Sequence, residues 1–448
     1  MRRLKEYLPI FGVFCLALLV RIIYNVIVAQ GYFPNFDAGV YDGLARNLIG
    51  IHCYCFIPHQ QSVFRPPLWP FMIAGVYSLV GEHSAYVRLL DCFLGSGTCI
   101  FVYLLARDIF NKRIALIVGL LAAIYTGLFI WDGWLYSESL YTFCLTAFIY
   151  TAFRVQQNLR APVTGKQFLR ISPSGWRWIV AGGILLGLAS LARPTGSEII
   201  GLLCIWAILV ILARMIHWQA AILSVVAIVL LAFIVQIPWI VRNYTVTHSF
   251  FPVSTLGQTL AGAYNDHVLE PDPSILHGTW WLDPSRNADI HPYTEANEQS
   301  DMAMALHWIR THLNDMPSLL LTHLRNMWRP YTYSFGSPLD QFPDRLSSKI
   351  LLVIIPIMEI PVFLLAALGL LFTWKRKKAE LLLAYLVIAM TIVQNIVFYG
   401  SPRFRAPIEP LLLLLAGGAF WWFVERRKKA QSVEPLVEPE KENVLSRA

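Results

Sequence analysis

Residues 85–131, AYVRLLDCFLGSGTCIFVYLLARDIFNKRIALIVGLLAAIYTGLFIW, hold two apolar runs separated by a short basic turn. Each run, 86–106 and 113–131, is close to the roughly 20 residues that a helix needs to cross the hydrocarbon core of a bilayer. The turn carries Arg107, Lys112 and Arg113, and basic loops favour the cytoplasmic side. The stretch therefore predicts two antiparallel transmembrane helices joined on the cytoplasmic side.

Similar apolar runs recur along the rest of the chain, and about ten candidates satisfy the length rule. With the two above, they are 7–28, 86–106, 113–131, 138–153, 178–192, 195–213, 219–240, 349–373, 380–399 and 407–424. Arg193-Pro194 separates the short run 178–192 from its successor, because proline stops a helix and restricts the residue before it. The expected fold class is an all-α polytopic membrane protein.

The composition agrees with a chain made of membrane helices. Of 448 residues, 56% are hydrophobic and only 14% are charged, whereas about a quarter of the residues in soluble domains are charged. The net charge of +8 is read as a topology signal in such a chain. No basic stripe interleaved with aromatic residues marks a soluble face, so we expect no nucleic-acid partner.

Ten spans would place every basic cluster on one side and both termini in the cytoplasm. The clusters include Arg2, Arg3, Lys5, Arg154, Lys166, Arg170, Lys375–Lys378 and Arg426–Lys429. Residues 67–82 are apolar but too short for a comfortable crossing, and a span here would reverse every later cluster. We therefore expect a re-entrant or interfacial helix there, in a multi-pass plasma (inner) membrane protein.

Two long external regions interrupt the spans. The second is expected to contain a helical stretch over 296–328, broken at Pro317 and lying on the bilayer with Arg325 and Arg329 facing lipid headgroups. The expected organisation is a first transmembrane helix (1–28), a first external loop with juxtamembrane helices (29–85), six transmembrane helices (86–240), a second external region (241–348), three transmembrane helices (349–430) and a disordered cytoplasmic tail (431–448).

Cys53 and Cys55 lie in the first external loop, between His52 and His59. Three alternatives are open for this pair. A zinc site is disfavoured because the spacing is not that of the usual C-x-x-C hairpin. Of the other two, a disulfide and two free thiols, we favour the free thiols.

Charged residues near a membrane are costly and suggest functional sites. The informative ones fall at the external ends of the expected helices, and two of them, Asp37 and Glu138, are acidic. The others are five arginines: Arg65, Arg193, Arg242, Arg403 and Arg405. Snorkelling side chains and helix caps would explain single cases, but not five arginines on the side where the positive-inside bias depletes them.

This combination suits the chemistry of a lipid phosphate. Arginine binds phosphate with two parallel hydrogen bonds and stabilises charge that develops on a leaving phosphate. A carboxylate can accept a proton from an attacking hydroxyl or amine. The residues therefore indicate group transfer from a phospholipid-like donor on the external face.

Motifs of a known family recur in order along most of the chain. They are Asp37 with Tyr41 and Ala45, RPPLWPFMIAGVYSLVGE (65–82), the stretch 85–125, SESLYTF (137–143), GILLGLASLARPTG (183–196), PWIVRNYTVTHSFFPVSTLGQ (238–258) and GSPRFRAPIEPLLLLLAG (400–417). In these pieces the chain resembles the GT-C class of polyprenyl-phosphate-sugar-dependent glycosyltransferases. Within that class it is similar to the bacterial group of protein O-mannosyltransferases and lipid A aminoarabinose transferases.

The resemblance implies a GT-C fold and transfer of a hexosyl or pentosyl group, with inversion, from a polyprenyl-phosphate donor to a lipid, glycan or protein acceptor. By it, Asp37 is the general base and Glu138 a second acidic site residue, while Arg65, Arg193, Arg242, Arg403 and Arg405 bind the donor phosphate. Family members often have a second acid beside the first, whereas here Ala38 follows Asp37. No cofactor is required by the family as a rule, and the sequence leaves a divalent metal open.

Alternatives remain open for the general base, for Glu138 and for the overall function. Asp42 is a rival to Asp37, although a helix-surface role is favoured for it. Glu138 is equally well explained as an acid favoured by the helix dipole, with Ser137 as the cap of that helix. A transporter or flippase for a lipid-linked or small anionic substrate is the alternative function, but transporters place polar residues at the membrane midplane. A scaffold without chemistry would leave the external arginines unexplained.

Overall fold

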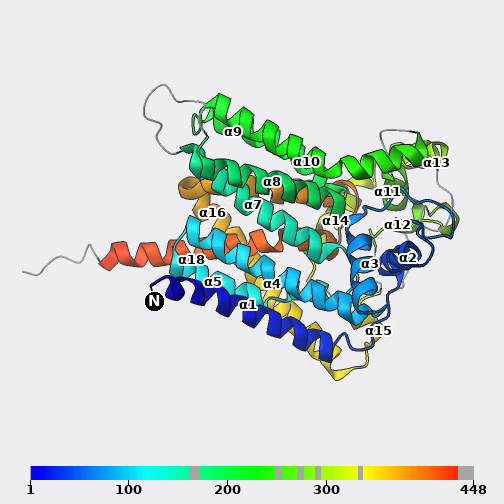
Figure 1. The fold of residues 1–448 in the computed structure, drawn as a ribbon, viewed down its shortest axis with the longest axis horizontal. Coiled ribbons are helices and arrows are strands. Elements are labelled where there is room, and N and C mark those ends of the chain that lie inside the picture. The colour runs from blue at the N-terminus through cyan, green and yellow to red at the C-terminus, as the bar shows by residue number, and fades with distance from the viewer. Residues whose placement is uncertain are drawn as a thin grey trace, which may run out of the picture.

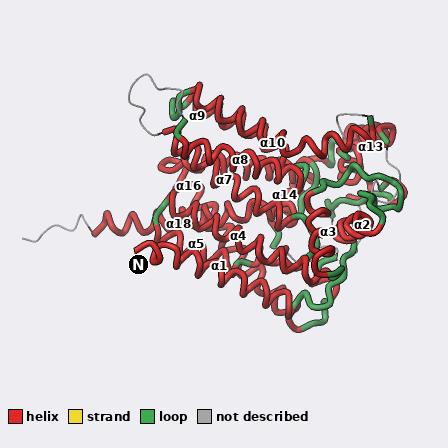
Figure 2. Tube along the Cα trace, in the orientation of Figure 1, coloured by secondary structure: helices red, strands yellow, loops and turns green. Residues whose placement is uncertain are grey.

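The computed structural model describes residues 2–160, 171–248, 255–269, 277–287, 294–330 and 336–431. These residues form helices and loops, and no strand occurs among them (Figure 2). The expectation of a disordered tail concerns residues that, beyond Gln431, lie outside the described ranges. Lys166 and Arg170, two of the basic loop residues, also lie outside them.

Within the described ranges, seven helices are long and apolar enough to cross a membrane. They are α1 (Arg2–Ile27), α4 (Ser84–Ile109), α8 (Pro173–Ala192), α9 (Thr195–Leu212), α10 (Trp218–Thr247), α16 (Leu346–Val397) and the run Pro402–Arg427, which contains α17 (Pro402–Arg405), η3 (Ala406–Ile408) and most of α18 (Glu409–Gln431). An eighth is formed if α5 (Lys112–Ile124) and the segment Thr126–Gly133, bent by 55°, make one span. That segment consists of α6 (Thr126–Phe129) and η1 (Ile130–Gly133). The chain is a multi-pass membrane protein.

The expected count of ten spans is not confirmed. If α5 and the segment Thr126–Gly133 make one span, two features account for the remaining difference. The run 138–153 lies in α7 (Glu138–Arg160), which is not among the apolar helices. Most of α7 is buried between its neighbours, so its surface does not have to be apolar all round. The runs 349–373 and 380–399 both fall within α16.

Helix α16 doubles back on itself. The hydroxyls of Thr373 and Tyr385 lie 2.7 Å apart, although the residues are separated by 12 positions. In a straight helix this separation spans about 18 Å along the axis. The indole of Trp374 also lies 5.5 Å from the Tyr385 ring. The two legs therefore meet at a bend that contains the basic run 375–378.

The long helices run side by side along the long axis of the molecule (Figure 1). The start of α1 and the end of α18 lie at one end of this bundle, and the shorter helices gather mainly at the other. These are α2 (Phe36–Gly50), α3 (Leu68–Val80), α11 (Leu256–Ala263), α12 (Asp266–Leu269), η2 (Pro284–Arg286), α13 (Glu295–Thr311), α14 (Met316–Trp328) and α15 (Pro338–Gln341). We call the end that holds α2 and α3 the loop end.

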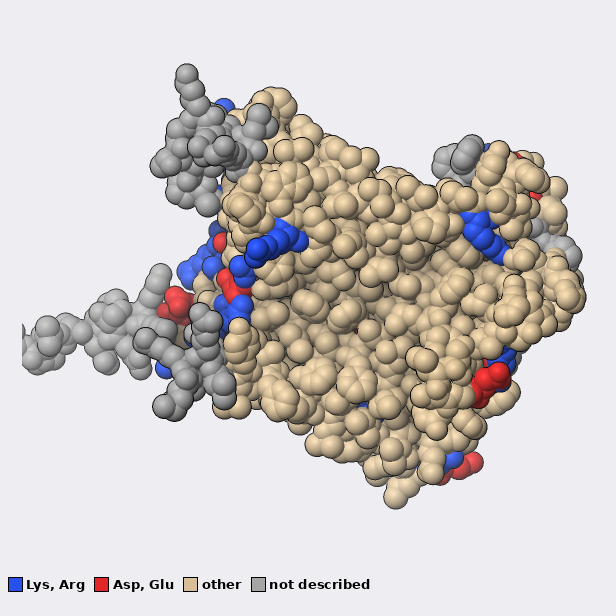
Figure 3. Space-filling model, in the orientation of Figure 1, with Lys and Arg blue, Asp and Glu red and all other residues tan. Residues whose placement is uncertain are grey.

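The short helices agree with the pattern of the sequence. Helix α3 coincides with the apolar stretch 67–82, whose 13 helical residues are too few for a crossing. The expected helical region 296–328 consists of α13 and α14, and Pro317 lies in the first turn of α14, where proline is tolerated. In Figure 3 the charged side chains gather near the two ends of the molecule, and the broad middle of that face is almost entirely uncharged. This distribution suits a bundle surrounded by lipid.

Candidate functional site

Asp37 lies in the first turn of α2, at the loop end of the bundle. The partial positive charge of a helix N-terminus favours a carboxylate at this position. Ala38, Tyr41 and Ala45 are buried and lie on one side of the helix, so they fix the orientation of α2. The Asp37 carboxylate is thereby held beside two guanidinium groups. The Oδ1 atom accepts a hydrogen bond from Arg65 Nη2 at 2.8 Å, and Oδ2 accepts one from Arg403 Nη1 at 2.5 Å.

Arg65 belongs to the loop that leads into α3. Pro66 and Pro67 follow it and restrict the backbone immediately before the helix. The Tyr54 hydroxyl lies 3.0 Å from the Arg65 carbonyl and 3.1 Å from that of Pro66, and it donates to this pair. The Arg65 guanidinium also lies over the Tyr41 ring, 5.6 Å from its centroid. Tyr54 therefore holds the backbone at Arg65 and Pro66, and Tyr41 contacts the arginine side chain.

Glu138 is the first residue of α7 and is fully buried. Its Oε1 atom accepts hydrogen bonds from Arg193 Nη1, at 2.6 Å, and from Arg403 Nε. The Oε2 atom is buried without a hydrogen-bond partner among the described residues. The Ser137 hydroxyl also has none there, so the expected side-chain cap of α7 is not formed. A side-chain cap by Ser137 therefore does not explain the polar residues at the start of α7.

Arg193 and Arg403 come from two breaks between helices. Arg193 follows the last residue of α8, and Pro194 prevents that helix from continuing. Arg403 is the second residue of α17, where the Ser401 hydroxyl caps the helix by accepting from the Arg403 backbone N–H at 3.2 Å. The Arg403 guanidinium lies 4.1 Å from the centroid of the Tyr136 ring. Both arginines are thus placed by short, constrained backbone.

Together these residues form one ion-pair network, which we call the Asp37 cluster. Its members in order of contact are Arg65, Asp37, Arg403, Glu138 and Arg193. Three arginines and two ionised carboxylates give it a formal charge of +1. Side-chain exposure is 0% at Glu138, 16% at Arg403 and 28% at Asp37. A ligand can therefore reach the cluster from the Asp37 side, while Glu138 forms its closed end.

The arginines also govern the proton affinity of Asp37. Burial alone would raise the pKa of this carboxyl group. The positive charges of Arg65 and Arg403, together with their hydrogen bonds, outweigh burial and hold the pKa well below its usual range. Asp37 is therefore ionised in this arrangement and is a weak proton acceptor while both arginines bind it.

Two tyrosines beside the cluster were not among the candidates from the sequence. Tyr136 lies under the Arg403 guanidinium. Desolvation raises the pKa of Tyr399 to about 12, and the nearby charge of Arg403 lowers it only in part. Both stand next to charged motifs, in YSES and YGSPRFR, and that adjacency was the available signal.

The structure places Arg242 outside this network. Its Nη1 donates to the Ser62 carbonyl at 2.5 Å and its Nη2 to the Tyr54 carbonyl at 3.4 Å. The guanidinium also stacks on Trp239, 4.7 Å from the ring centroid. Because Tyr54 also holds the Arg65 carbonyl, Arg242 supports the loop that carries Arg65.

Arg405 is buried away from Asp37 and is engaged on several sides. It forms ion pairs with Glu359 at 2.7 Å and Glu409 at 2.5 Å. Its Nη1 donates to the carbonyls of Met327, at 2.5 Å, and Arg329, at 2.9 Å. This residue joins α14, α16 and α18, and it is positioned to hold the fold together rather than to contact a donor.

We expect Arg405→Met to destabilise the protein strongly. The substitution would leave two buried carboxylates without their shared cation, and breaking a buried pair in this way typically costs about 3–5 kcal/mol. The melting temperature of the purified protein in detergent, followed by tryptophan fluorescence, measures the effect. Arg46→Met is the matched control, because the Arg46 side chain is 41% exposed and exposed pairs contribute about 0–1 kcal/mol. Equal melting temperatures for Arg405→Met and the native protein would refute the assignment.

Other candidates from the first external region are resolved by their contacts. Asp42 accepts from Arg46 Nε at 2.7 Å and from the Tyr77 hydroxyl, so it pairs outside the Asp37 cluster.

Cys53 and Cys55 form a disulfide, and our preference for free thiols was wrong. Their Cα atoms are 5.3 Å apart, a separation that a disulfide spans. In the described part of the chain, no group of three His, Cys, Asp or Glu side chains is arranged to hold a metal ion.

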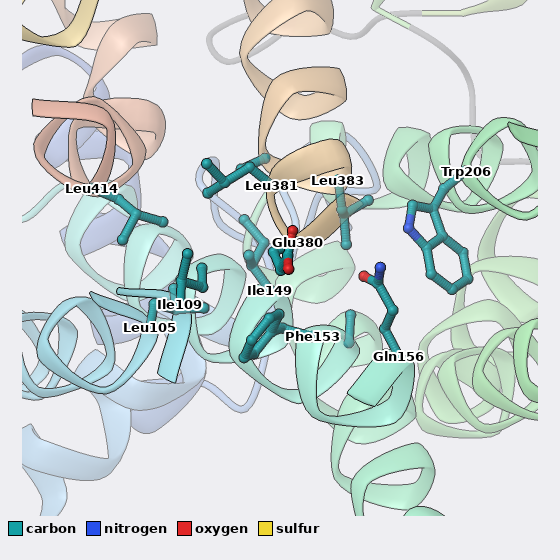
Figure 4. A pocket seen from close by; sticks show the side chains of 12 residues that line it. Leu105, Ile109, Ile149, Phe153, Gln156, Trp206, Glu380, Leu381, Leu383 and Leu414 are labelled. Atoms are coloured by element: carbon teal, nitrogen blue, oxygen red, sulfur yellow. The ribbon is translucent and has the colours of Figure 1, made fainter. Parts of the chain in front are cut away.

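A small cavity lies among α4, α7, α9 and α16 (Figure 4). Apolar side chains such as Leu105, Ile149 and Phe153 line it, and Gln156 and Glu380 are its polar groups. Its volume is about 10 Å³, which is close to the minimum for one water molecule. It is therefore too small for a sugar or a lipid headgroup.

Comparison with known proteins gives a partial match to one family model and a similar fold among solved structures. A family model described as dolichyl-phosphate-mannose-protein mannosyltransferase matches residues 64–239. A search of curated protein sequences finds no significant match. Among solved structures, the oligosaccharyltransferase AglB from Archaeoglobus fulgidus, in complex with an inhibitory peptide and a dolichol-phosphate, aligns with a TM-score of 0.57 and 15% identity. The alignment covers 99% of this chain and 53% of that one.

Two further structures are similar. The apo form of the Archaeoglobus fulgidus oligosaccharyltransferase aligns with a TM-score of 0.59 and 14% identity, over 96% of this chain and 52% of that one. ArnT from Cupriavidus metallidurans, bound to undecaprenyl phosphate, aligns with a TM-score of 0.46 and 14% identity, over 95% and 81% of the two chains. The chain spans about half the length of the oligosaccharyltransferases. The two oligosaccharyltransferase alignments, each with a TM-score above 0.5, confirm the GT-C fold expected from the sequence.

Proposed function

We propose that this chain, which has the GT-C fold, is a membrane glycosyltransferase that moves a sugar from a polyprenyl-phosphate donor to an acceptor. The observation that carries the proposal is the Asp37 cluster, in which arginines suited to a phosphate share one ion-pair network with a partly exposed carboxylate. Arginine is the preferred side chain for planar, bidentate recognition of phosphate. A carboxylate beside it can receive the proton of an attacking hydroxyl or amine.

In the proposed reaction, an oxygen or nitrogen of the acceptor attacks the anomeric carbon of the donor sugar. The bond between that carbon and the phosphate oxygen breaks, and its electron pair leaves with the polyprenyl phosphate. The acceptor proton passes to Asp37, and Arg65 and Arg403 stabilise the charge on the leaving phosphate. A single displacement of this kind inverts the anomeric configuration. The leaving phosphate needs no protonation, so one carboxylate base suffices.

The contacts of Arg403 support a place for the donor phosphate. Its Nη1 and Nε atoms bind Asp37 and Glu138, while Nη2 donates no hydrogen bond among the described residues. A phosphate at this nitrogen would compete with Asp37 for the two arginines that hold it. The release of Asp37 would raise its pKa toward the usual value and make it a better base. Donor binding and base activation are thus linked in this proposal.

The remaining assignments follow from the resemblance and from the charge pattern. Glu138 orients Arg403 and Arg193, or the acceptor, from the closed end of the cluster. We place the site on the external face of the membrane with both termini in the cytoplasm, as the basic clusters suggest. The transferred group is a hexose or pentose, and the reaction is proposed to require no cofactor.

Reconstituted protein tests the proposal directly. Proteoliposomes are supplied with radiolabelled polyprenyl-phosphate sugars and a mixture of lipid and peptide acceptors, and new glycosidic products and free polyprenyl phosphate are measured. Release of polyprenyl phosphate that matches formation of a glycoside would support the transferase. Label that crosses the vesicle membrane without any new glycosidic bond would instead support the transporter.

The linkage between Asp37 and its arginines predicts two different pH profiles. In the free enzyme the pKa of Asp37 is depressed, so kcat/KM should fall only as the pH drops below the usual aspartate value of about 3.9. In the donor complex the arginines are shared with phosphate, so kcat should begin to fall at a higher pH. Initial rates between about pH 3.5 and 8 test this prediction, because kcat/KM should stay nearly constant over this range while kcat falls at its acid end. Coincident acid limbs would contradict the linkage.

The variant Arg65→Gln sharpens this measurement. It removes one of the two charges that depress the pKa of Asp37, so the acid limb of the kcat/KM profile should move to higher pH. The Asp37–Arg65 pair also affects the stability of the fold, because the pKa of the Asp37 carboxyl group is lower in the folded protein than in the unfolded chain. Its stabilising contribution is present above the unfolded pKa and is lost as the pH falls through the folded pKa.

A further inference from the structure

A second group of arginines lies at the C-terminal end of α14. Arg325 and Arg329 line a cavity of about 760 Å³ together with His277, Asn326 and Trp328. Pockets for small ligands typically measure about 300–1,000 Å³, so this cavity has room for more than an inorganic ion. None of the arginines of the Asp37 cluster lines it.

The chemistry of this cavity selects for anions. No carboxylate is found among its described lining residues. Within the described ranges, neither the Arg325 nor the Arg329 guanidinium donates a hydrogen bond or forms an ion pair, in contrast to the arginines of the Asp37 cluster. The Asn326 amide is already engaged, because it donates to the His277 carbonyl at 2.9 Å. Two guanidinium groups are therefore the available donors.

Their spacing suits one ligand group. Arg325 lies in the last turn of α14 and Arg329 is the residue that caps its C-terminus, so the two side chains leave the helix about one turn apart. Two guanidinium groups that line one cavity can donate hydrogen bonds to different oxygens of the same phosphate. The geometry therefore favours a phosphate over a singly hydrogen-bonding polar group.

The surroundings of the cavity favour a lipid as the carrier of that phosphate. The indole of Trp328 packs against Phe363 of the membrane helix α16, at 5.4 Å between ring centroids. Leu321, next to the lining residue Thr322, is 49% exposed. Leu321 lies one helical turn before Arg325, so an exposed apolar side chain stands beside the arginines, as is common at the membrane interface. These surroundings are those expected where acyl chains and headgroups meet.

We propose that this cavity binds the phosphate headgroup of an anionic lipid, at a site separate from the Asp37 cluster. Arg325 and Arg329 contact the phosphate oxygens, and Trp328 lies beside the glycerol or sugar part of the headgroup. The backbone of the site is anchored by Arg405, which binds the carbonyls of Met327 and Arg329. The site needs no movement of the chain to present its two guanidinium groups.

Binding of dioctanoyl phosphatidic acid to the full chain in detergent tests the proposal, measured by native mass spectrometry. Arg325→Gln and Arg329→Gln should each weaken binding by about tenfold, and the double variant by more, because hydrogen bonds to charged groups are the strong ones. Arg310→Gln, an exposed arginine of α13 outside the cavity, is the matched control and should bind as the native protein does. Unchanged affinity in the double variant would overturn the proposal.

Two further measurements show whether the lipid headgroup or free phosphate is bound, and at which of the two sites. Inorganic phosphate at the same concentration should not displace the lipid, and equal displacement would overturn the assignment to a lipid headgroup. Arg65→Gln, altered at the Asp37 cluster, should retain binding at this cavity. If Arg65→Gln loses the bound lipid while the α14 variants keep it, the lipid occupies the Asp37 cluster and the second site does not exist.

Discussion

Asp37→Asn is expected to lower kcat by about 10²–10⁴-fold, the range that a positioned general base contributes. The amide keeps the size of the side chain and can still accept a hydrogen bond, but it cannot take the acceptor proton. Donor binding should be unchanged or tighter, because Arg65 and Arg403 lose the carboxylate that competes with phosphate for them. Rates with saturating radiolabelled donor, set beside equilibrium donor binding, separate the two effects.

Asp42→Asn is the matched control for this experiment. Asp42 lies in the same helix, but it pairs with Arg46 and Tyr77 instead of the arginines of the cluster. It should retain native turnover. If Asp37→Asn turns over at the native rate, or if Asp42→Asn is the variant that fails, the assignment of the base is wrong.

Arg403→Gln is expected to have the largest effect on donor binding. Arg403 alone contacts both carboxylates of the cluster, and it is 16% exposed. Truncating one partner of a buried, hydrogen-bonded charge pair costs about 2–5 kcal/mol, which corresponds to a dissociation constant roughly 30-fold or more higher. Arg403→Lys should not restore binding, since a single ammonium does not reproduce the fork that reaches Asp37 and Glu138.

Donor affinity and thermal stability are measured together for these variants. Arg46→Gln serves as the control, because this arginine forms an exposed pair outside the cluster. Arg403→Gln with native donor affinity would remove Arg403 from the phosphate site. Loss of affinity only in proportion to a loss of folded protein would show that the residue is structural.

Much of the bundle could be predicted because hydrophobic length is a strong signal. The expected run 195–213 corresponds to α9, and 178–192 lies within α8, with the break at Arg193-Pro194 in the right place. The count of ten spans is not confirmed, since α7 is enclosed by other helices and the two apolar runs of α16 form two legs of one bent helical segment. Burial inside a bundle is a tertiary property that a hydropathy pattern does not contain.

The candidate site could likewise be predicted only in part from the sequence. Sequence position predicted that Asp37, Glu138 and the arginines would gather at one end, and five of those residues do form one network. It did not separate Arg403 from Arg405, although the two side chains, from the same short helix, have different partners. Glu359, a partner of Arg405, lies 46 positions away in α16, so this pair depends on the packing of helices.

The Cys53–Cys55 disulfide bears on orientation by a route independent of charge. Glutathione and thioredoxin keep thiols reduced in the cytosol, and disulfides persist in the periplasm, the secretory lumen and outside the cell. The bond lies in the same loop as Arg65, which contacts Asp37. Redox chemistry therefore favours the non-cytosolic side for the loop end, in agreement with the lysine and arginine pattern at the opposite end of the bundle.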